Sequence, residues 1–176
     1  MILGKYSIGI GDRFAKQGKA QLQAIMDAKS MGVDIVPIWN KSYREHSIVG
    51  TVPRDVRREA DEAVASLRWK GAYFCDADHI GLKNVDMFLD ACDFFTLDVA
   101  DFIGKPAEPN AIEKFVKNCT KYARTLRIHG IASPFEVTIE QIRTIAEKFL
   151  LAVQEAGKIY RYIEKKLGSG KFVTEI

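Results

Sequence analysis

Short apolar segments alternate with amphipathic segments along most of this chain, and this alternation restricts the folds that it can adopt. Four segments have the length and apolar content of buried strands, at residues 6–10, 33–39, 72–75 and 94–99. Apolar residues at helical spacing occur at residues 18–31, 53–69, 84–91 and 110–123. Strands that are separated by helices assemble as successive βα units. We therefore expect an α/β fold with a parallel sheet.

The length of the chain limits the size of that sheet. A complete (β/α)8 barrel takes about 250 residues, whereas this chain has 176 residues, of which 47% are hydrophobic. That content is enough to bury one core. We expect a single α/β domain over residues 1–176, which is either a smaller open sheet or an incomplete segment of a TIM-like barrel.

Charge and cysteine content exclude several classes of protein. The net charge is +3 and the basic residues are scattered, so the chain has no signature of nucleic-acid binding. No apolar run approaches membrane-spanning length, and the first residues do not resemble a signal peptide. The three cysteines have no CxxC spacing and lie in apolar surroundings. We expect reduced thiols in a soluble cytoplasmic protein.

Residues 138–168 predict a long amphipathic helix. Thr138 and Gln141 match the capping-box pattern at its start. Apolar residues then follow at steps of four and three, a heptad seam formed by Ile142, Ala146, Phe149, Val153, Ala156, Tyr160, Ile163 and Leu167. A seam of this length needs a partner surface, either the body of the domain or a second chain. A homo-oligomer that pairs through this helix is therefore one expectation. The strand-like run 171–176 follows it.

Acidic and imidazole side chains are concentrated directly after the apolar run at residues 72–75. Asp76, Asp78 and His79 fall within four residues there. This combination is typical of metal sites and of acid/base catalysis. On the alternative, structural interpretation, the two aspartates cap the following turn and His79 lies at the surface.

Polar residues also lie at the ends of the other three predicted strands. In parallel α/β folds the functional groups gather at the carboxyl ends of the strands. The residues in question are Asp12 and Arg13, Asn40 and Lys41, and Asp98 and Asp101. Surface turns alone do not explain acids and bases after every apolar strand. We therefore favour a functional site at this edge, next to a predicted loop at residues 40–53.

Four separated segments of the chain resemble the tagaturonate epimerase family. They are SIGIGDRF at residues 7–14, WNKS with REH at 39–46, DADH at 76–79 and FFTLDVAD at 94–101. The resemblance implies interconversion of D-tagaturonate and D-fructuronate with a divalent metal, for which zinc, manganese and nickel are candidates. Members of that family are longer on both sides, so this chain resembles a fragment. A complementing chain would then supply the missing part, and activity of the chain alone is not implied.

The chemistry of such a reaction assigns roles to the residues at the strand ends. The two sugars differ at a carbon β to the ketone, so a retro-aldol cleavage and re-addition would invert it. We expect Asp78 as the base, His79 as a metal ligand, and Asp76 as a second metal ligand or a catalytic orienting group. The substrate-binding residues that we expect are Asp12, Arg13, Asn40, Lys41 and Asp98, with the two cations directed to the substrate carboxylate.

Structural roles remain open for the same residues. Arg13 would then pair with Asp12, and Lys41 with Glu45. Two other functions also remain open for the chain. One is a non-catalytic α/β domain that binds a sugar acid or a phosphate at the same edge. The other is an assembly module that pairs through the 138–168 helix.

Overall fold

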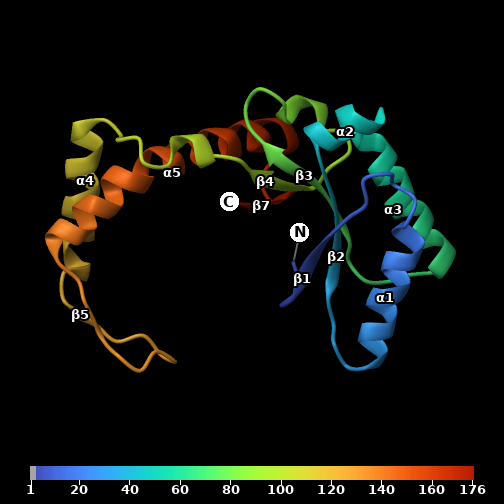
Figure 1. Cartoon of the computed structure of the whole chain (residues 1–176), viewed down its shortest axis with the longest axis horizontal. Helices are drawn as coiled ribbons and strands as arrows, with labels where there is room; N and C mark the ends of the chain where they lie inside the picture. Colours follow the sequence, from blue (N-terminus) through green and yellow to red (C-terminus); the bar gives the residue numbers. More distant parts are fainter. Residues whose placement is uncertain (1–2) are drawn as a thin grey trace. The chain divides into compact units, whose positions relative to one another are not determined.

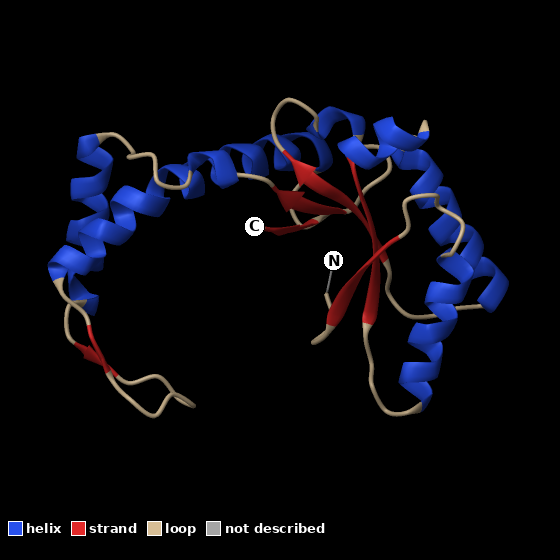
Figure 2. Ribbon diagram, in the orientation of Figure 1, coloured by secondary structure: helices blue, strands red, loops and turns tan. Residues whose placement is uncertain are grey.

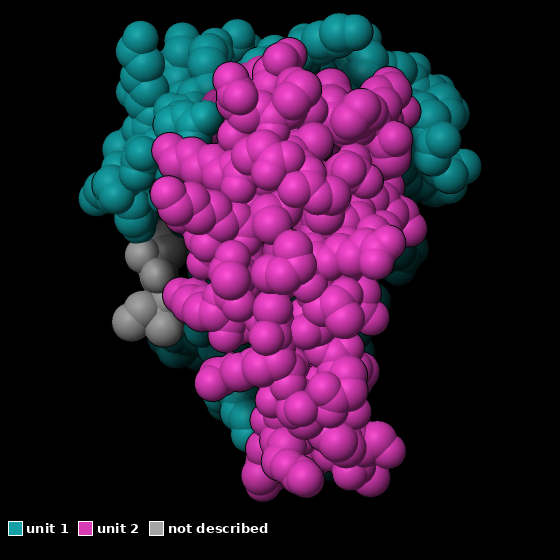
Figure 3. Space-filling model, turned by 90° about the vertical axis from the view of Figure 1, so that its left-hand side faces the viewer, with its two compact units in different colours: residues 1–98, 159–176 teal, residues 99–158 magenta. Residues whose placement is uncertain are grey.

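A computed structural model describes residues 3–176 of the chain. It divides into two compact units (Figure 3). The sheet unit contains residues up to 98 together with residues 159–176, and the second unit contains residues 99–158. No described helix is long and apolar enough to cross a membrane.

The sheet unit is built on five parallel strands, which confirms the predicted α/β fold. The strands are β1 (Ser7–Gly11), β2 (Val36–Ser42), β3 (Phe74–Ile80), β4 (Phe94–Leu97) and β7 (Val173–Glu175) (Figures 1 and 2). Their order in the sheet, β1-β2-β3-β4-β7, follows their order along the chain. A doubly wound sheet reverses its strand order at a switch point. The order of these five strands has no such reversal, and the sheet therefore resembles part of a (β/α)8 barrel.

Two helices cover one face of this sheet. Helix α1 (Gly18–Ser30) and helix α3 (Pro53–Leu67) contact each other and strand β2 (Figure 1). They bury Leu22 and Ile25 of α1, and Val56 and Ala60 of α3. The indole N–H of Trp39 donates to Gln21 of α1 at 3.1 Å, so the odd-numbered positions of β2 face the helices.

The opposite face of the sheet is layered. Side chains alternate between faces along a strand, so the even-numbered positions of β2, β3 and β4 share the face away from α1. Ile38, Phe74 and Phe94 form one apolar cluster there. Two residues further along these strands come Asn40, Asp76 and Thr96. An apolar layer thus lies below a polar layer near the carboxyl ends of the strands.

Strand β2 and the segment after it differ from the sequence prediction. Asn40, Lys41 and Ser42 belong to β2, and the predicted loop at 40–53 contains a helix, α2 (Tyr43–Val49). The prediction of a loop was therefore wrong. The signal for a helix was present, because Ser42 and Glu45 form a capping box in which the Glu45 N–H donates to Ser42 Oγ at 3.3 Å.

Strand β3 also extends further than predicted. It continues to Ile80, so Asp76, Asp78 and His79 lie within the strand and not after it. Polar residues are depleted in strands, and for this reason the sequence prediction ended the strand too early, at Cys75. The predicted helix at 84–91 is a single 3-10 turn, η1 (Val85–Met87).

The second unit is mainly helical. It contains η2 (Ala100–Phe102), α4 (Pro109–Cys119), η3 (Thr120–Tyr122), the hairpin of β5 (Thr125–Leu126) with β6 (Phe135–Glu136), and the first part of α5 (Ile139–Leu167). Its core is formed by Ala107, Ile112, Val116, Ile142 and Ala146.

Helix α5 confirms the predicted long helix and its cap. The Thr138 N–H donates to Gln141 Oε1 at 2.8 Å, and the Gln141 N–H donates to Thr138 Oγ1 at 3.1 Å. The heptad seam is only partly buried, because Phe149, Val153 and Tyr160 are exposed. Ala152 and Ile159 are buried in addition to the predicted Ala156 and Ile163. A helix of 3.6 residues per turn drifts from a 3.5-residue repeat, and the two halves of α5 bury different faces.

A buried polar cluster holds α2 against β2. Lys41 is 1% exposed, and its ammonium group donates to the Arg13 carbonyl and to Thr51 Oγ1, the latter at 3.0 Å. The His46 ring is 3% exposed, and its Nδ1 lies 2.9 Å from the same Thr51 hydroxyl. Burial, and then the Lys41 charge, lower the pKa of His46 to about 4.

This pKa predicts that acid weakens the fold. Because the pKa of an unfolded histidine is about 6.5, the neutral ring stabilises the protein above that pH. The stabilisation is lost as pH falls from 6.5 towards 4. We expect the free energy of unfolding to drop by about 2 kcal/mol from this group. Urea unfolding at pH 7.5 and 4.5 should show a smaller drop for His46→Asn than for the wild type. An equal drop in both proteins would contradict the prediction.

Candidate functional site

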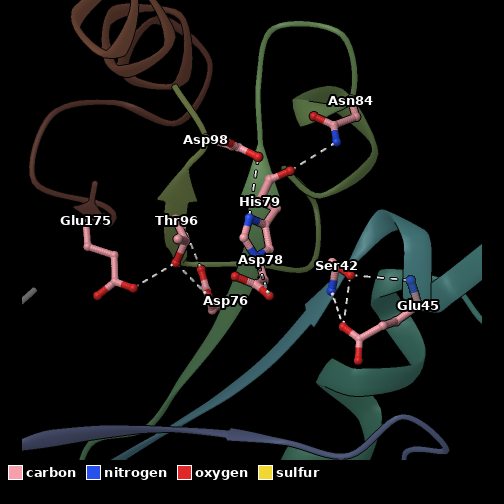
Figure 4. Close-up of polar contacts among 9 residues, drawn as sticks. All are labelled: Ser42, Glu45, Asp76, Asp78, His79, Asn84, Thr96, Asp98 and Glu175. Carbon is pink, nitrogen blue, oxygen red and sulfur yellow. Dashed lines mark hydrogen bonds and ion pairs between the residues drawn. The ribbon is translucent and has the colours of Figure 1, made fainter. Parts of the chain in front are cut away.

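The candidate site lies where β3 and β4 end, and it is centred on His79 (Figure 4). His79 Nδ1 lies 3.4 Å from an Asp98 carboxylate oxygen, and His79 Nε2 lies 3.8 Å from an Asp78 oxygen. The backbone of His79 has a φ of +54°, and the pairing of β3 with β4 shifts register between Ala77 and Ile80. Such irregularities redirect side chains and recur beside active sites. Here the irregularity leaves the His79 ring 64% exposed.

Asp76 lies below His79 and is nearly enclosed. Its carboxylate is 5% exposed, and it accepts the Thr96 N–H at 3.0 Å and the Thr96 hydroxyl at 2.9 Å. Burial raises the pKa of Asp76 to about 7, with further increases from the charges of Asp78 and Glu175 and a partial decrease from the Thr96 hydrogen bonds. An acid with a pKa near 7 can both hold and accept a proton at neutral pH.

Asp78 opens onto a hollow of about 610 Å³. Burial raises its pKa, His79 opposes that increase, and the charges of Glu45 and Glu175 add to it. The hollow is also lined by Gly9, Gly11, Arg13, Phe14, Asn40 and Glu45. The structure thus brings together a carboxylate, a guanidinium group and an amide that were predicted from separate strand ends.

The side-chain amide oxygen of Asn40 is buried without a hydrogen-bond donor. Its Oδ1 is the one buried side-chain polar atom in residues 3–176 without a hydrogen-bond partner. Leaving a buried acceptor unpaired costs about 1–3 kcal/mol. A hydroxyl group of a ligand or a water molecule would satisfy it.

Two predicted substrate-binding residues support the turn that carries Arg13. Lys41 lies on the helix-facing side of β2 and donates to the Arg13 carbonyl. Asp12 accepts the backbone N–H groups of Phe14, Lys16 and Gln17 at 3.0, 2.5 and 2.8 Å. Neither cation pairs as the structural alternatives expected: no ion pair joins Arg13 to Asp12 or Lys41 to Glu45 within the described residues.

The donors around His79 suit a divalent metal in part. Imidazole nitrogen and carboxylate oxygen are ligands of zinc, manganese and nickel, and His79 is flanked by the carboxylates of Asp78 and Asp98. Within residues 3–176, however, no group of three or more His, Cys, Asp or Glu side chains has the geometry to hold a metal. The chain therefore offers a partial ligand set. Both Asp76 oxygens are bonded to Thr96, which favours the orienting role for Asp76 over the ligand role.

Three residues near the site were not identified from the sequence. The capping-box spacing of Ser42 and Glu45 is the sequence feature that could have identified Glu45. For Glu175 the corresponding feature is an acidic residue within the strand-like run 171–176. Thr96 is the one polar residue of strand β4, and its contact with Asp76 links it to the site.

Comparison with known proteins identifies the family. A family model described as tagaturonate epimerase (UxaE) matches residues 2–169. The chain belongs to the tagaturonate epimerase family. No curated protein sequence matches it.

Solved structures of the family share this fold. Three crystal structures of fructuronate-tagaturonate epimerase UxaE from Cohnella laeviribosi are similar to the chain. The complex with one glycerol has a TM-score of 0.69 at 21% identity and covers 96% of this chain. The native form has a TM-score of 0.65 at 24% identity and covers 97% of this chain. The complex with two glycerols has a TM-score of 0.66 at 22% identity and covers 98% of this chain. The chain spans 36–37% of the length of these relatives.

The contacts of Asp12 predict a measurable structural role. Burial alone would raise the pKa of Asp12, but its three backbone N–H partners lower it below the usual value. Asp12→Asn keeps the shape and removes the charge that these donors stabilise. We expect a loss of about 1 kcal/mol in the free energy of unfolding, measured with urea. Exposed Asp34→Asn, whose partner Lys29 is also exposed, is the control. Equal stability of Asp12→Asn and the control would show that these hydrogen bonds do not stabilise the fold.

Proposed function

We propose that this chain carries catalytic and substrate-binding residues of a metal-dependent epimerase that interconverts D-tagaturonate and D-fructuronate. Its family membership supports the reaction class. The observation that carries the proposal is the position of Asp78, which lines one hollow with Arg13 and Asn40 and lies beside His79. A base, a cation for a carboxylate and a hydroxyl-binding amide are the groups that a sugar-acid substrate needs.

The proposed mechanism is a retro-aldol cleavage followed by re-addition. Asp78 takes the proton from the hydroxyl group on the carbon that inverts, and the adjacent carbon–carbon bond breaks to give an aldehyde and an enediolate. The aldehyde turns, the bond re-forms on its other face, and Asp78 returns the proton to the new alkoxide. Arg13 holds the substrate carboxylate and Asn40 binds a hydroxyl group.

The remaining residues support these steps. Asp76 orients the site beside Asp78, while Lys41 and Asp12 hold the turn that carries Arg13. His79, with Asp98 as the further candidate ligand, would hold the divalent metal. When bound, that metal supplies Lewis-acid stabilisation of negative charge on oxygen. Ligands from the longer family members would complete the partial set of this chain.

Asp78→Asn should abolish epimerase activity in an enzyme that carries this segment in full. The amide keeps the shape of the side chain but cannot accept the proton. Loss of a general base costs about 10²–10⁴-fold in rate. The assay is conversion of tagaturonate to fructuronate, with circular dichroism to verify folding. Near-full activity of the variant would place the base elsewhere, and Asp98 and Asp101 would be tested next.

His79→Ala should weaken metal binding, and a loss of turnover should follow from the weaker binding. Calorimetry with manganese, zinc and nickel measures the binding, and excess metal should restore part of the turnover. If the wild-type chain binds none of the three metals but does bind the sugar acid, the site is that of a non-catalytic sugar-acid-binding domain. Binding of inorganic phosphate in place of the sugar acid would indicate a phosphate-binding domain.

We also propose that a second chain covers part of α5. Ile145, Phe149 and Val153 lie four residues apart on the first half of the helix, and all three are exposed. Side chains at this spacing form one stripe, and an exposed apolar stripe of this kind is typical of an interface. The second chain is either another copy or the chain that supplies the rest of the enzyme.

Light scattering tests the homo-oligomer. We expect a dimer for the wild type and a monomer for Phe149→Glu, because a charge in the stripe would be desolvated on pairing. Glu147→Gln, on the same helix and outside the stripe, should leave the dimer intact. A wild type that is purely monomeric would eliminate the stripe as a contact between copies.

A further inference from the structure

One hydroxyl group joins two carboxylates from different strands. Thr96 Oγ1 of β4 lies 2.9 Å from Asp76 Oδ2 of β3 and 3.0 Å from Glu175 Oε1 of β7 (Figure 4). Thr96 and Glu175 are directly paired in the sheet, and the Thr96 N–H holds the other Asp76 oxygen at 3.0 Å. Neither Thr96 nor Glu175 has a role in the mechanism above.

The proton count of a hydroxyl group makes these two contacts interdependent. A threonine hydroxyl has one proton and can donate it to one acceptor at a time. When both carboxylates are ionised, Asp76 and Glu175 therefore compete for the same proton. The presence of Glu175 consequently determines how much of the Thr96 hydrogen bond reaches Asp76. In the low dielectric around a buried carboxylate, such hydrogen bonds are stronger than in water.

The two carboxylates differ in their surroundings. Asp76 is 5% exposed, whereas Glu175 is exposed. Glu175 is thus the solvent-facing end of a chain of three groups that leads to an enclosed acid next to Asp78. The charge of Glu175 also acts on Asp78 directly.

We propose that Glu175 is a positioning residue of the site and acts on Asp76 through the Thr96 hydroxyl group. The effect on turnover rests on the proposed epimerase function, whereas the effect on Asp76 does not. The competing explanation is that the Thr96–Glu175 contact only fixes the register of the edge strand β7. Under that explanation the response of Asp76 to Glu175 is the same with and without the Thr96 hydroxyl group.

Carbon-13 NMR of the aspartate carboxyl groups separates these explanations in this chain at one fixed pH. The Asp76 signal is assigned by its loss in Asp76→Asn. We expect this signal to move in Thr96→Val and also in Glu175→Gln. In the Thr96→Val background, Glu175→Gln should move the signal less than it does in the wild type, because the connecting hydroxyl is absent and only the charge of Glu175 still acts on Asp76. Thr96→Ser, which keeps the hydroxyl, should restore the wild-type position.

The chain provides a matched control. Thr125 and Glu136 form a second threonine–glutamate pair between neighbouring strands, at 2.7 and 2.9 Å. Glu136→Gln breaks the same kind of contact without touching Asp76, so the Asp76 signal should not move. The proposal is overturned if Glu175→Gln leaves the signal in place, or if it moves the signal equally with and without the Thr96 hydroxyl.

Kinetics give the second readout. We expect Glu175→Gln to lower kcat about tenfold, as loss of an outer partner does, with KM unchanged because Glu175 does not bind substrate. The loss caused by Glu175→Gln should be smaller in the Thr96→Val background than in the wild type, since part of the effect of Glu175 passes through the Thr96 hydroxyl group. Additive losses would overturn that path. These kinetics are measured in an enzyme that carries this segment in full. A wild type without turnover there would overturn the epimerase function, while the NMR result would still decide the role of Glu175.

Discussion

The strict alternation of side chains along five parallel strands is the constraint on which the rest of this structure depends. Trp39 faces α1 and bonds to Gln21, so its neighbours Ile38 and Asn40 must face away. The same alternation puts Phe74 and Asp76 of β3, and Phe94 and Thr96 of β4, on this one face. One face is therefore available for helix packing, and the other is available for a polar layer at the carboxyl ends.

That polar layer is costly to form, and its contacts show how the cost is reduced. A buried carboxylate is unfavourable unless it is hydrogen-bonded or protonated. Thr96 supplies two donors to Asp76, and the remaining cost is expressed as a pKa raised to about 7. The same burial that destabilises the charged form gives Asp76 the proton affinity that acid/base chemistry at neutral pH requires. Stability of the charged form and proton affinity thus oppose each other at this residue.

The geometry at His79 follows from a local departure from regular pairing. If β3 and β4 kept one register to their ends, His79 would continue the alternation of Cys75 and Ala77 towards the helices. The register shift after Ala77 and the positive φ of His79 instead leave its ring exposed between Asp78 and Asp98. The lower part of β3 is regular and buried, and it anchors the irregular part.

The sequence by itself determined most of the helices and strands and the residues at the centre of the candidate site. The βα alternation, the Thr138–Gln141 cap and the grouping of Asp76, Asp78 and His79 depend on neighbouring residues, whose local geometry sequence spacing specifies. Only the tertiary structure decided what depends on strand pairing and packing. Packing buries Lys41 against the Arg13 carbonyl, and it buries different faces of α5 in the two halves of the helix. Strand pairing connects Glu175 to Asp76 through Thr96. Thr96 and Glu175 are 79 residues apart along the chain, and only strand pairing in the sheet brings them together.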